Sequence, residues 1–283
     1  MNYFLMVLSV CLEMCKNAVS NHYSKKTVKN DADIYKFNMY LYIGSFVLML
    51  FFKGYSASLF TVLTAFVFAL TTAASQHFVM KAFEAGPMSF TIFIQGCNLI
   101  IPIIYGVAVL NEQLTLLRVV SVAVLIFSMS LVLNLKLEAV NKKWLIFSVL
   151  SMLFTGGIGI LQTVHQNSAY KNEFTAFLRL TFLFAVVINC IMWRLCEKKD
   201  KSCYASISTT TAAACLMGIF IGAVNIINLY LSGVVDKIVL FPFLNGGLIF
   251  ASIMVSVIVF REKISVKQWI GLLIGIISMC LLC

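Results

Sequence analysis

The segment NEQLTLLRVVSVAVLIFSMSLVL (111–133) recurs 150 residues later as REKISVKQWIGLLIGIISMCLLC (261–283). The two segments align without a gap, and the identical pairs are Glu112/Glu262, Ile126/Ile276, Ser128/Ser278, Met129/Met279 and Leu131/Leu281. The match continues upstream, where FIQGCN (93–98) lies over FLNGGL (243–248) and places Gln95 opposite Asn245. Self-similarity at one offset indicates that the chain is built from two related halves, which we place at 1–135 and 136–283.

Composition decides the class of protein. Of the 283 residues, 61% are hydrophobic and 11% are charged, and the mean hydropathy is +0.98. A soluble globule with a polar surface cannot be made from such a chain. The composition therefore predicts an integral membrane protein.

Apolar runs of about 20 residues, the length that crosses a ~30 Å hydrocarbon core, occur along nearly the whole chain. Lipid offers no partners for backbone polar groups, and the runs lack the alternation of barrel strands, so each run is expected to be a helix. The fold class is therefore all-α, with five helices in each half. An odd number of spans per half makes the second half enter the membrane from the opposite side, which is an inverted repeat. The ten predicted transmembrane helices lie near 2–22, 36–53, 58–80, 88–110, 114–134, 143–168, 174–195, 205–231, 238–260 and 264–283.

The basic residues predict the orientation. Lys and Arg are concentrated in the segments 25–36, 136–143, 194–201 and 261–267, which follow odd-numbered predicted helices. By the positive-inside rule these segments are cytoplasmic, so both termini point outward. The first apolar run has charges in its middle and no cleavage site, so we expect a true first helix rather than a signal peptide. We expect a multi-pass protein of the cell (inner) membrane, and we attribute the net charge of +10 to topology rather than to nucleic-acid binding.

Each half closes with a short turn of the form E-x-[LI]-[ST], at Glu112-Gln113-Leu114-Thr115 and at Glu262-Lys263-Ile264-Ser265. The duplicated turn and the two halves of five helices resemble the drug/metabolite transporter superfamily, in its EamA-like branch. The resemblance implies a solute transporter whose central cavity is lined by helices 1, 3, 4, 6, 8 and 9. It also implies cytoplasmic termini, which conflicts with the charge bias. We expect Glu112 and Glu262 to be structural.

Helix 1 places Ser9, Glu13, Lys16, Asn17 and Ser20 on one face, with Glu13 near the membrane midplane. An ionisable group at that depth must face the bundle interior or water. Two interpretations stay open: a structural pair that fixes helix packing, or a solute site. This helix also resembles the first helix of small multidrug resistance transporters, in which a lone Glu exchanges protons for cations. Lys16 departs from that pattern and suits a zwitterion instead.

Polar side chains in other helices are candidates for the same cavity. Helix 6 has a stripe of Ser151, Thr155, Gly159, Gln162 and Gln166, which is expected to face helix 1. Gln95 and Asn245 are stronger candidates because the repeat aligns them with each other. Gln76 and Asn228 are weaker candidates. The predicted solute-binding residues are Glu13, Lys16, Asn17, His77, Gln95, Asn98, Gln162, His165, Asn225 and Asn245.

The sequence predicts a secondary, non-ATP transporter of a small polar, zwitterionic or cationic metabolite, such as an amino acid or an amine, with protons as a candidate coupling ion. The alternative is a flippase for a lipid or lipid-linked sugar. The candidate hydrogen-bond donors to its phosphate group are Lys16, Lys81 and Arg179. Arg179 is also expected to reach the membrane interface. No catalytic motif lies within a span, so an enzyme is not predicted. We expect no metal and no cofactor, and either a monomer or a homodimer.

Overall fold

The structure, a computed structural model, describes residues 2–26, 28, 30–86, 88–113, 115–132, 142–197, 208–260 and 265–282. These residues form α-helices joined by short connections, and they contain no β-strand. The helices are α1 (Asn2–Lys26), α2 (Asp31–Leu50), α3 (Leu59–Ala85), α4 (Met88–Gly96), α5 (Ile100–Leu110), α6 (Leu116–Val132), α7 (Lys142–Gln166), α8 (Phe174–Glu197), α9 (Ser208–Val234), α10 (Lys237–Phe260) and α11 (Val266–Leu282), with 3₁₀ turns η1 (Cys97–Leu99) and η2 (Lys171–Glu173).

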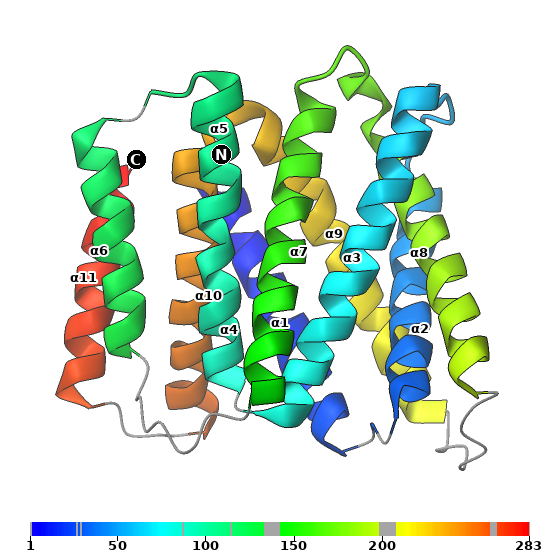
Figure 1. Ribbon diagram of the computed structural model, residues 1–283, viewed down its shortest axis with the longest axis horizontal. Helices are drawn as coiled ribbons and strands as arrows, with labels where there is room; N and C mark the ends of the chain where they lie inside the picture. Colours follow the sequence, from blue (N-terminus) through cyan, green and yellow to red (C-terminus); the bar gives the residue numbers. More distant parts are fainter. Residues whose placement is uncertain are drawn as a thin grey trace.

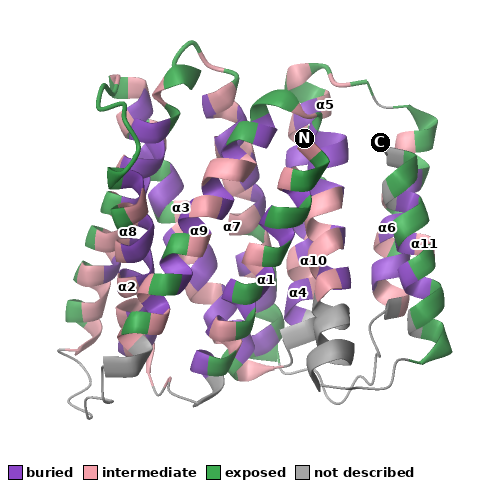
Figure 2. Ribbon diagram, turned by 180° about the vertical axis from the view of Figure 1, so that it is seen from behind, coloured by how far each residue is buried: buried purple, intermediate pink, exposed green. Residues whose placement is uncertain are grey.

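The predicted all-α class is confirmed for the described residues. Within them, six helical segments are long and apolar enough to cross a membrane, and three shorter apolar helices accompany them. Large apolar side chains such as Leu63, Ile104 and Leu273 are more than half exposed on the outside of the bundle. Figure 2 shows exposed residues along the outer faces of the helices and buried residues between them. An apolar exterior over a buried polar interior is compatible with a multi-pass membrane protein.

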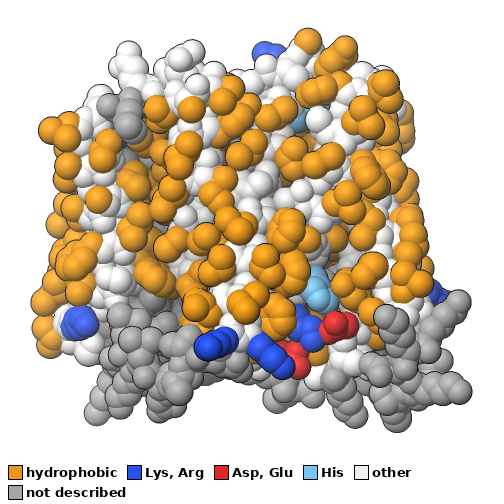
Figure 3. Space-filling view, viewed as in Figure 1, with side chains coloured by type: hydrophobic (Ala, Val, Ile, Leu, Met, Phe, Trp, Pro, Cys, Tyr) orange, Lys and Arg blue, Asp and Glu red, His pale blue; other side chains and the backbone are white. Residues whose placement is uncertain are grey.

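The helices run roughly side by side, with α6 and α11 at one edge and α2 and α8 at the other (Figure 1). The most extensive contacts are between α3 and α7, between α2 and both α8 and α9, and between α6 and α11. Helices of the first half therefore pack mainly against helices of the second half. Figure 1 places both termini toward the same end of the bundle, and in Figure 3 the described Lys and Arg of the viewed face gather mostly at the opposite end.

The predicted helix at 88–110 is divided into α4, η1 and α5. Pro102 lies in the first turn of α5, and its ring nitrogen cannot donate to the carbonyl of Asn98, four residues earlier. The 3₁₀ turn occurs at this point, over Cys97–Leu99. The local change of helix type thus follows from the proline, and it places Asn98 at the turn.

Helices α2 and α9 approach so closely that glycine is required on both. A Cβ atom built on Gly44 would lie 2.0 Å from the carbonyl oxygen of Cys215, and one built on Gly218 would lie 1.9 Å from the carbonyl oxygen of Leu41. The Ser45 hydroxyl uses this proximity and donates to the Gly218 carbonyl at 2.6 Å. Small residues that let helix backbones meet are typical of membrane bundles.

Replacing Gly218 by Ala is expected to lower the melting temperature of the purified protein markedly, because backbone cannot move aside as a side chain can. Overpacking of this kind typically costs about 1–3 kcal/mol. Gly222→Ala is the matched control, one turn along α9, where the nearest atom to a Cβ would be in the flexible Leu48 side chain at 2.9 Å and the nearest backbone atom would be at an ordinary contact distance of 3.4 Å. Equal melting temperatures for the two variants would contradict the close approach of α2 and α9.

Arg179 does not reach for the interface. Its side chain is buried and donates to the carbonyls of Met49, Phe52 and Gly54, at the end of α2 and in the connection that follows. The guanidinium also lies over the Tyr55 ring, 4.3 Å from its centroid. The last carbonyls of a helix have no partner within the helix, and Arg179 supplies one. The expectation of a snorkelling arginine is therefore corrected.

Glu112 is structural, as its place in the repeated turn predicted. Its carboxylate accepts from the backbone N–H of Lys237 at 3.0 and 3.2 Å, and its Oε1 lies 3.5 Å from the Lys237 ammonium. A carboxylate at the first turn of α10 satisfies an N–H that has no partner within the helix and favours the helix dipole. Glu262, its counterpart in the repeat, lies outside the described residues.

Candidate functional site

A cavity of about 170 Å³ lies at the centre of the bundle, between helices of both halves. Eight of the ten predicted solute-binding residues line it. The rest of the lining combines uncharged polar residues with apolar residues and glycines. The polar lining residues are Ser9, Glu13, Lys16, Asn17, Tyr42, Thr72, Ser75, Gln76, Gln95, Asn98, Thr155, Gln162, Asn225, Asn228 and Asn245.

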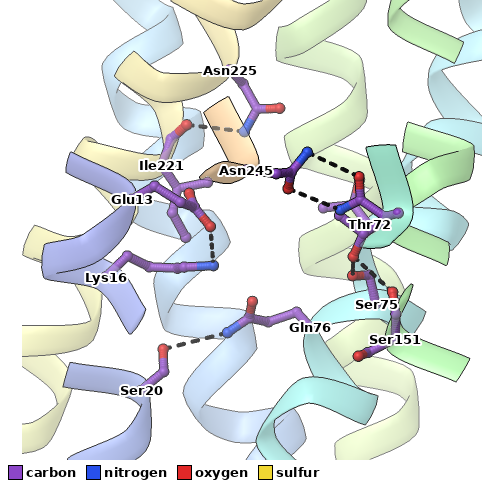
Figure 4. Close-up of polar contacts among 12 residues, drawn as sticks. Glu13, Lys16, Ser20, Thr72, Ser75, Gln76, Ser151, Ile221, Asn225 and Asn245 are labelled. Carbon is purple, nitrogen blue, oxygen red and sulfur yellow. Dashed lines mark hydrogen bonds and ion pairs between the residues drawn. The ribbon is translucent and has the colours of Figure 1, made fainter. Parts of the chain in front are cut away.

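Glu13 and Lys16 form an ion pair within one turn of α1, with 2.5 Å between Oε1 and Nζ. The Lys16 side chain is 10% exposed and the Glu13 side chain is 30% exposed. Figure 4 shows both side chains extending from α1 toward residues of α3 and α10. Among the described residues, neither bonds to another helix. The second carboxylate oxygen of Glu13 therefore keeps its capacity to accept hydrogen bonds.

Two asparagines join the halves across the cavity. The amides of Asn98 and Asn245 exchange hydrogen bonds, with N–O distances of 3.3 and 3.2 Å. Asn245 also donates to the carbonyl of Phe241 at 2.9 Å. The pair thus links the η1 turn, where the helix type changes, to α10. These amide groups already have hydrogen-bond partners. A ligand would therefore form additional hydrogen bonds with them and would not satisfy an unpaired group.

Three further hydrogen bonds cross the walls of the cavity. Gln76 on α3 donates to Ser20 on α1 at 3.4 Å, which Figure 4 shows below the ion pair. In the second half, Gln162 on α7 donates to Asn225 on α9 at 3.3 Å. Ser9 on α1 donates to Asn228 on α9 at 2.7 Å. The first two bonds hold the first and third helices of each half together, and the third bond joins α1 of the first half to α9 of the second.

Gln95 on α4 also lines the cavity, but the structure gives its amide no hydrogen bond among the described residues. Asn245, its counterpart in the repeat, is occupied by Asn98. The Gln95 side chain is only partly buried, so its amide is available to a molecule in the cavity. Of the equivalent pair Gln95 and Asn245, Gln95 is the one left for a ligand, and the buried Oδ1 of Asn17, which also lines the cavity, likewise has no partner among the described residues.

Sequence reasoning missed Tyr42, Thr72 and Ser75, which the structure brings to the cavity. Ser75 bonds to Thr155 of α7 at 2.7 Å, and Tyr42 donates to the carbonyl of Thr72 at 3.2 Å. Thr72, Ser75 and Gln76 follow one another at i, i+3 and i+4, which is one helix face. That spacing could have identified the α3 wall of the cavity. Nothing comparable in the sequence marks Tyr42.

His77 and His165 lie away from the cavity. His77 stacks on Tyr35, with ring centroids 4.5 Å apart, at the end of the bundle where Lys81 pairs with Asp31. His165 is buried, stacks on Phe177 at 4.2 Å and faces the Thr61 hydroxyl. Both rings are in packing positions. Their assignment to the solute site is therefore not supported by where they lie.

Apolar packing bounds the cavity toward the end of the bundle where the termini lie. Met6, Leu231 and Leu240 form a buried cluster between α1, α9 and α10. A second cluster joins α5 to α10. Among the described residues no group of His, Cys, Asp and Glu is arranged to hold a metal ion. The site is therefore a cavity with one charged pair and a mixed polar and apolar lining, bounded on one side by clusters of apolar side chains.

No protein-family model matches the chain, and no curated protein matches it. Solved structures do match. One, described only as "Crystal structure of protein", superposes with a TM-score of 0.73 over 98% of this chain and 97% of its own, at 10% sequence identity. This likeness shows the fold alone. The helical arrangement is thus shared, nearly end to end, with a protein of very different sequence.

Proposed function

We propose that this protein is a secondary transporter that moves a small polar, zwitterionic or cationic metabolite by alternating access. The observation that carries the proposal is the central cavity, which holds a buried ion pair and a lining of amides and hydroxyls inside an apolar bundle. Polar groups in such a place are costly, and in membrane proteins they mark substrate and ion pathways. At about 170 Å³ the cavity is smaller than the ~300 Å³ or more of sites for drug-sized ligands, which favours a small solute.

Ten membrane passes in two inverted halves are part of this proposal. Three pairs of corresponding helices have equal lengths, namely 25 residues for α1 and α7, 27 for α3 and α9, and 17 for α6 and α11, whereas α2 and α8 have 20 and 24. The two termini lie toward the same end, as an even number of passes requires. Inverted halves around a site at the midplane are a plan of secondary transporters. The same features support distant membership of the EamA-like drug/metabolite transporters, in a cell membrane.

The ion pair is better explained by solute binding than by helix packing. A buried pair that fixes packing would bridge two helices, but Glu13 and Lys16 lie three residues apart on α1. Burying two charges costs several kcal/mol per ion in desolvation, and among the described residues no hydrogen bond or ion pair from another helix offsets that cost. A pair of this kind is expected where charge is needed by a ligand. Protons remain the candidate coupling ion, through Glu13.

The cations proposed for a lipid-phosphate site in the flippase alternative are occupied. Lys81 pairs with Asp31 and lies 3.7 Å from Glu84, while Arg179 is held by backbone carbonyls. Lys16 pairs with Glu13. Lys81 and Arg179 therefore already have acceptors, and at Lys16 the adjacent Glu13 carboxylate would repel a phosphate group. The arrangement favours a solute carrier over a lipid flippase.

Gln95→Ala is the sharpest test of the cavity as a solute site. A screen of amino acids, amines and nucleosides against the wild-type protein is expected to yield a solute that raises its melting temperature and is taken up into proteoliposomes. Because the Gln95 amide has no hydrogen-bond partner within the described part of the chain, Gln95→Ala is expected to leave the ligand-free melting temperature unchanged. The same change is expected to weaken binding and uptake of that solute about tenfold.

Gln113→Ala, in the exposed connection after α5, is the matched control and should behave as wild type. Undiminished uptake by folded Gln95→Ala would show that the solute does not bind in this cavity. Absence of any stabilising solute, together with absence of any uptake, would count against transport itself.

A further inference from the structure

The charges in the cavity cancel. Among the described lining residues, Glu13 and Lys16 are the ionisable pair, and every other polar lining group is a hydroxyl or an amide. The carboxylate and the ammonium are in contact, so a molecule in the cavity meets both charges at similar distances. A monovalent ion would be attracted by one group and repelled by the other. The pair therefore provides one binding group of each charge, while the net charge of the described lining stays zero.

The wall contributed by the second half is neutral where α1 is charged. The polar stripes of α1 and α7 match at an offset of 142 residues, which puts Ser9 over Ser151, Asn17 over Gly159 and Ser20 over Gln162. At this offset, Thr155 and Ile158 occupy the places of Glu13 and Lys16.

The hydrogen bonds support this alignment of α1 with α7. Ser20 bonds to Gln76, and its counterpart Gln162 bonds to Asn225, which is the counterpart of Gln76 at the same place in α9. Thr155 is already bonded to Ser75 and to the Ser151 carbonyl. The charge pair is thus an addition made by one half alone.

We propose that Lys16 is a specificity-determining residue of the cavity, and that it restricts the solute to molecules without net charge, above all zwitterions. This inference rests on the proposed function. A zwitterion places its cationic group at the accessible oxygen of Glu13 and its anionic group at the ammonium of Lys16. A simple cation gains the first contact but is opposed by the ammonium of Lys16, whose Nζ is 2.5 Å from the other carboxylate oxygen. Lys16 therefore excludes cations, and Glu13 excludes anions in the same way.

Lys16→Met tests the exclusion of cations directly. Methionine keeps most of the length of the lysine side chain and removes the charge, which leaves Glu13 alone. Binding of choline to the purified protein in lipid nanodiscs is expected to be at least tenfold tighter in Lys16→Met than in wild type. Glycine betaine has the same trimethylammonium group with a carboxylate added, and it is expected to show no such gain. In the wild type, glycine betaine is expected to bind more tightly than choline.

Glu13→Gln is the mirror experiment, because it leaves Lys16 alone. This variant is expected to gain affinity for propionate and not for choline, while the neutral double variant Glu13→Gln/Lys16→Met gains neither. Lys81→Met is the matched control, since Lys81 is ion-paired but does not line the cavity.

The inference is overturned if a folded single variant shows no gain for its ion, or if the wild type binds choline more tightly than glycine betaine. These assays measure binding, so their failure is distinct from a failure of transport. Uptake that depends on Gln95, together with unaltered ion selectivity in Lys16→Met, would remove the inference and leave the proposed function intact.

Discussion

Glu13→Gln is expected to abolish transport, and adding Lys16→Met is expected to restore stability without restoring transport. The single change leaves Lys16, which is 8% exposed, as an unpaired buried charge. Removing one partner of a buried pair typically costs about 3–5 kcal/mol, and we expect the lower end because the carboxylate faces the cavity. Removing both charges ends that penalty. It also removes both groups that would bind a charged solute.

The measurement combines uptake into proteoliposomes with melting temperatures for the wild type, the single variant and the double variant. A double variant that is stable and inactive supports the solute site. A double variant with wild-type uptake would refute it and return the pair to a structural role. For an active wild type, a pH profile of uptake that Glu13→Gln removes or shifts would identify Glu13 as the group that also carries a coupling proton.

Arg179→Met is expected to produce a large loss of stability. The guanidinium donates to Gly54 at 2.8 Å, to Phe52 at 2.5 Å and to Met49 at 3.2 Å, all through backbone carbonyls. Without it, the Phe52 carbonyl loses its donor, and the Met49 and Gly54 carbonyls keep only longer bonds, from the Phe52 N–H at 3.3 Å and the Thr175 hydroxyl at 3.4 Å. Each hydrogen bond from a charged group contributes about 1.5–3 kcal/mol. We expect a total loss of at least about 3 kcal/mol, seen as a lower melting temperature in detergent.

Arg194→Met provides the control for Arg179. Arg194 pairs with Glu197 at 3.4 Å, but its side chain is 65% exposed. Exposed pairs contribute about 0–1 kcal/mol, so this variant should melt close to wild type. If Arg179→Met and Arg194→Met melted at the same temperature, Arg179 would not hold α2 as described. Arg179→Lys is expected to rescue little, because one ammonium cannot reach three separated carbonyls as the planar guanidinium does.

Much of the architecture could be predicted from the sequence, because the composition indicates that lipid surrounds the chain. In lipid, an apolar run of sufficient length must be helical, so run length alone located most helices. The helices that contain the repeated segments, α6 and α11, have equal lengths and pack together. The structural role of Glu112 also followed from its position in a repeated turn.

The periodicity of a single helix was enough to predict part of the site. Glu13, Lys16 and Asn17 lie on one face of α1 whatever surrounds it, and their charge and polarity require that face to point inward. The same reasoning failed for the histidines. His77 directly follows Gln76, but successive residues of a helix are rotated by about 100° around its axis. The His77 ring therefore faces Tyr35 instead of the cavity. His165 is one turn beyond Gln162, past the end of the cavity.

The sequence by itself determined an all-helical, apolar chain with a charged face on its first helix, because these properties depend on local pattern and on the surrounding solvent. Only the tertiary structure decided which polar groups are left free. Gln95 and Asn245 are equivalent in the repeat, yet Asn98 occupies one amide and leaves the other open to the cavity. Arg179 likewise is tied to α2 because that helix ends beside it. Such pairings depend on the rotation and approach of helices distant in sequence, which no local pattern encodes.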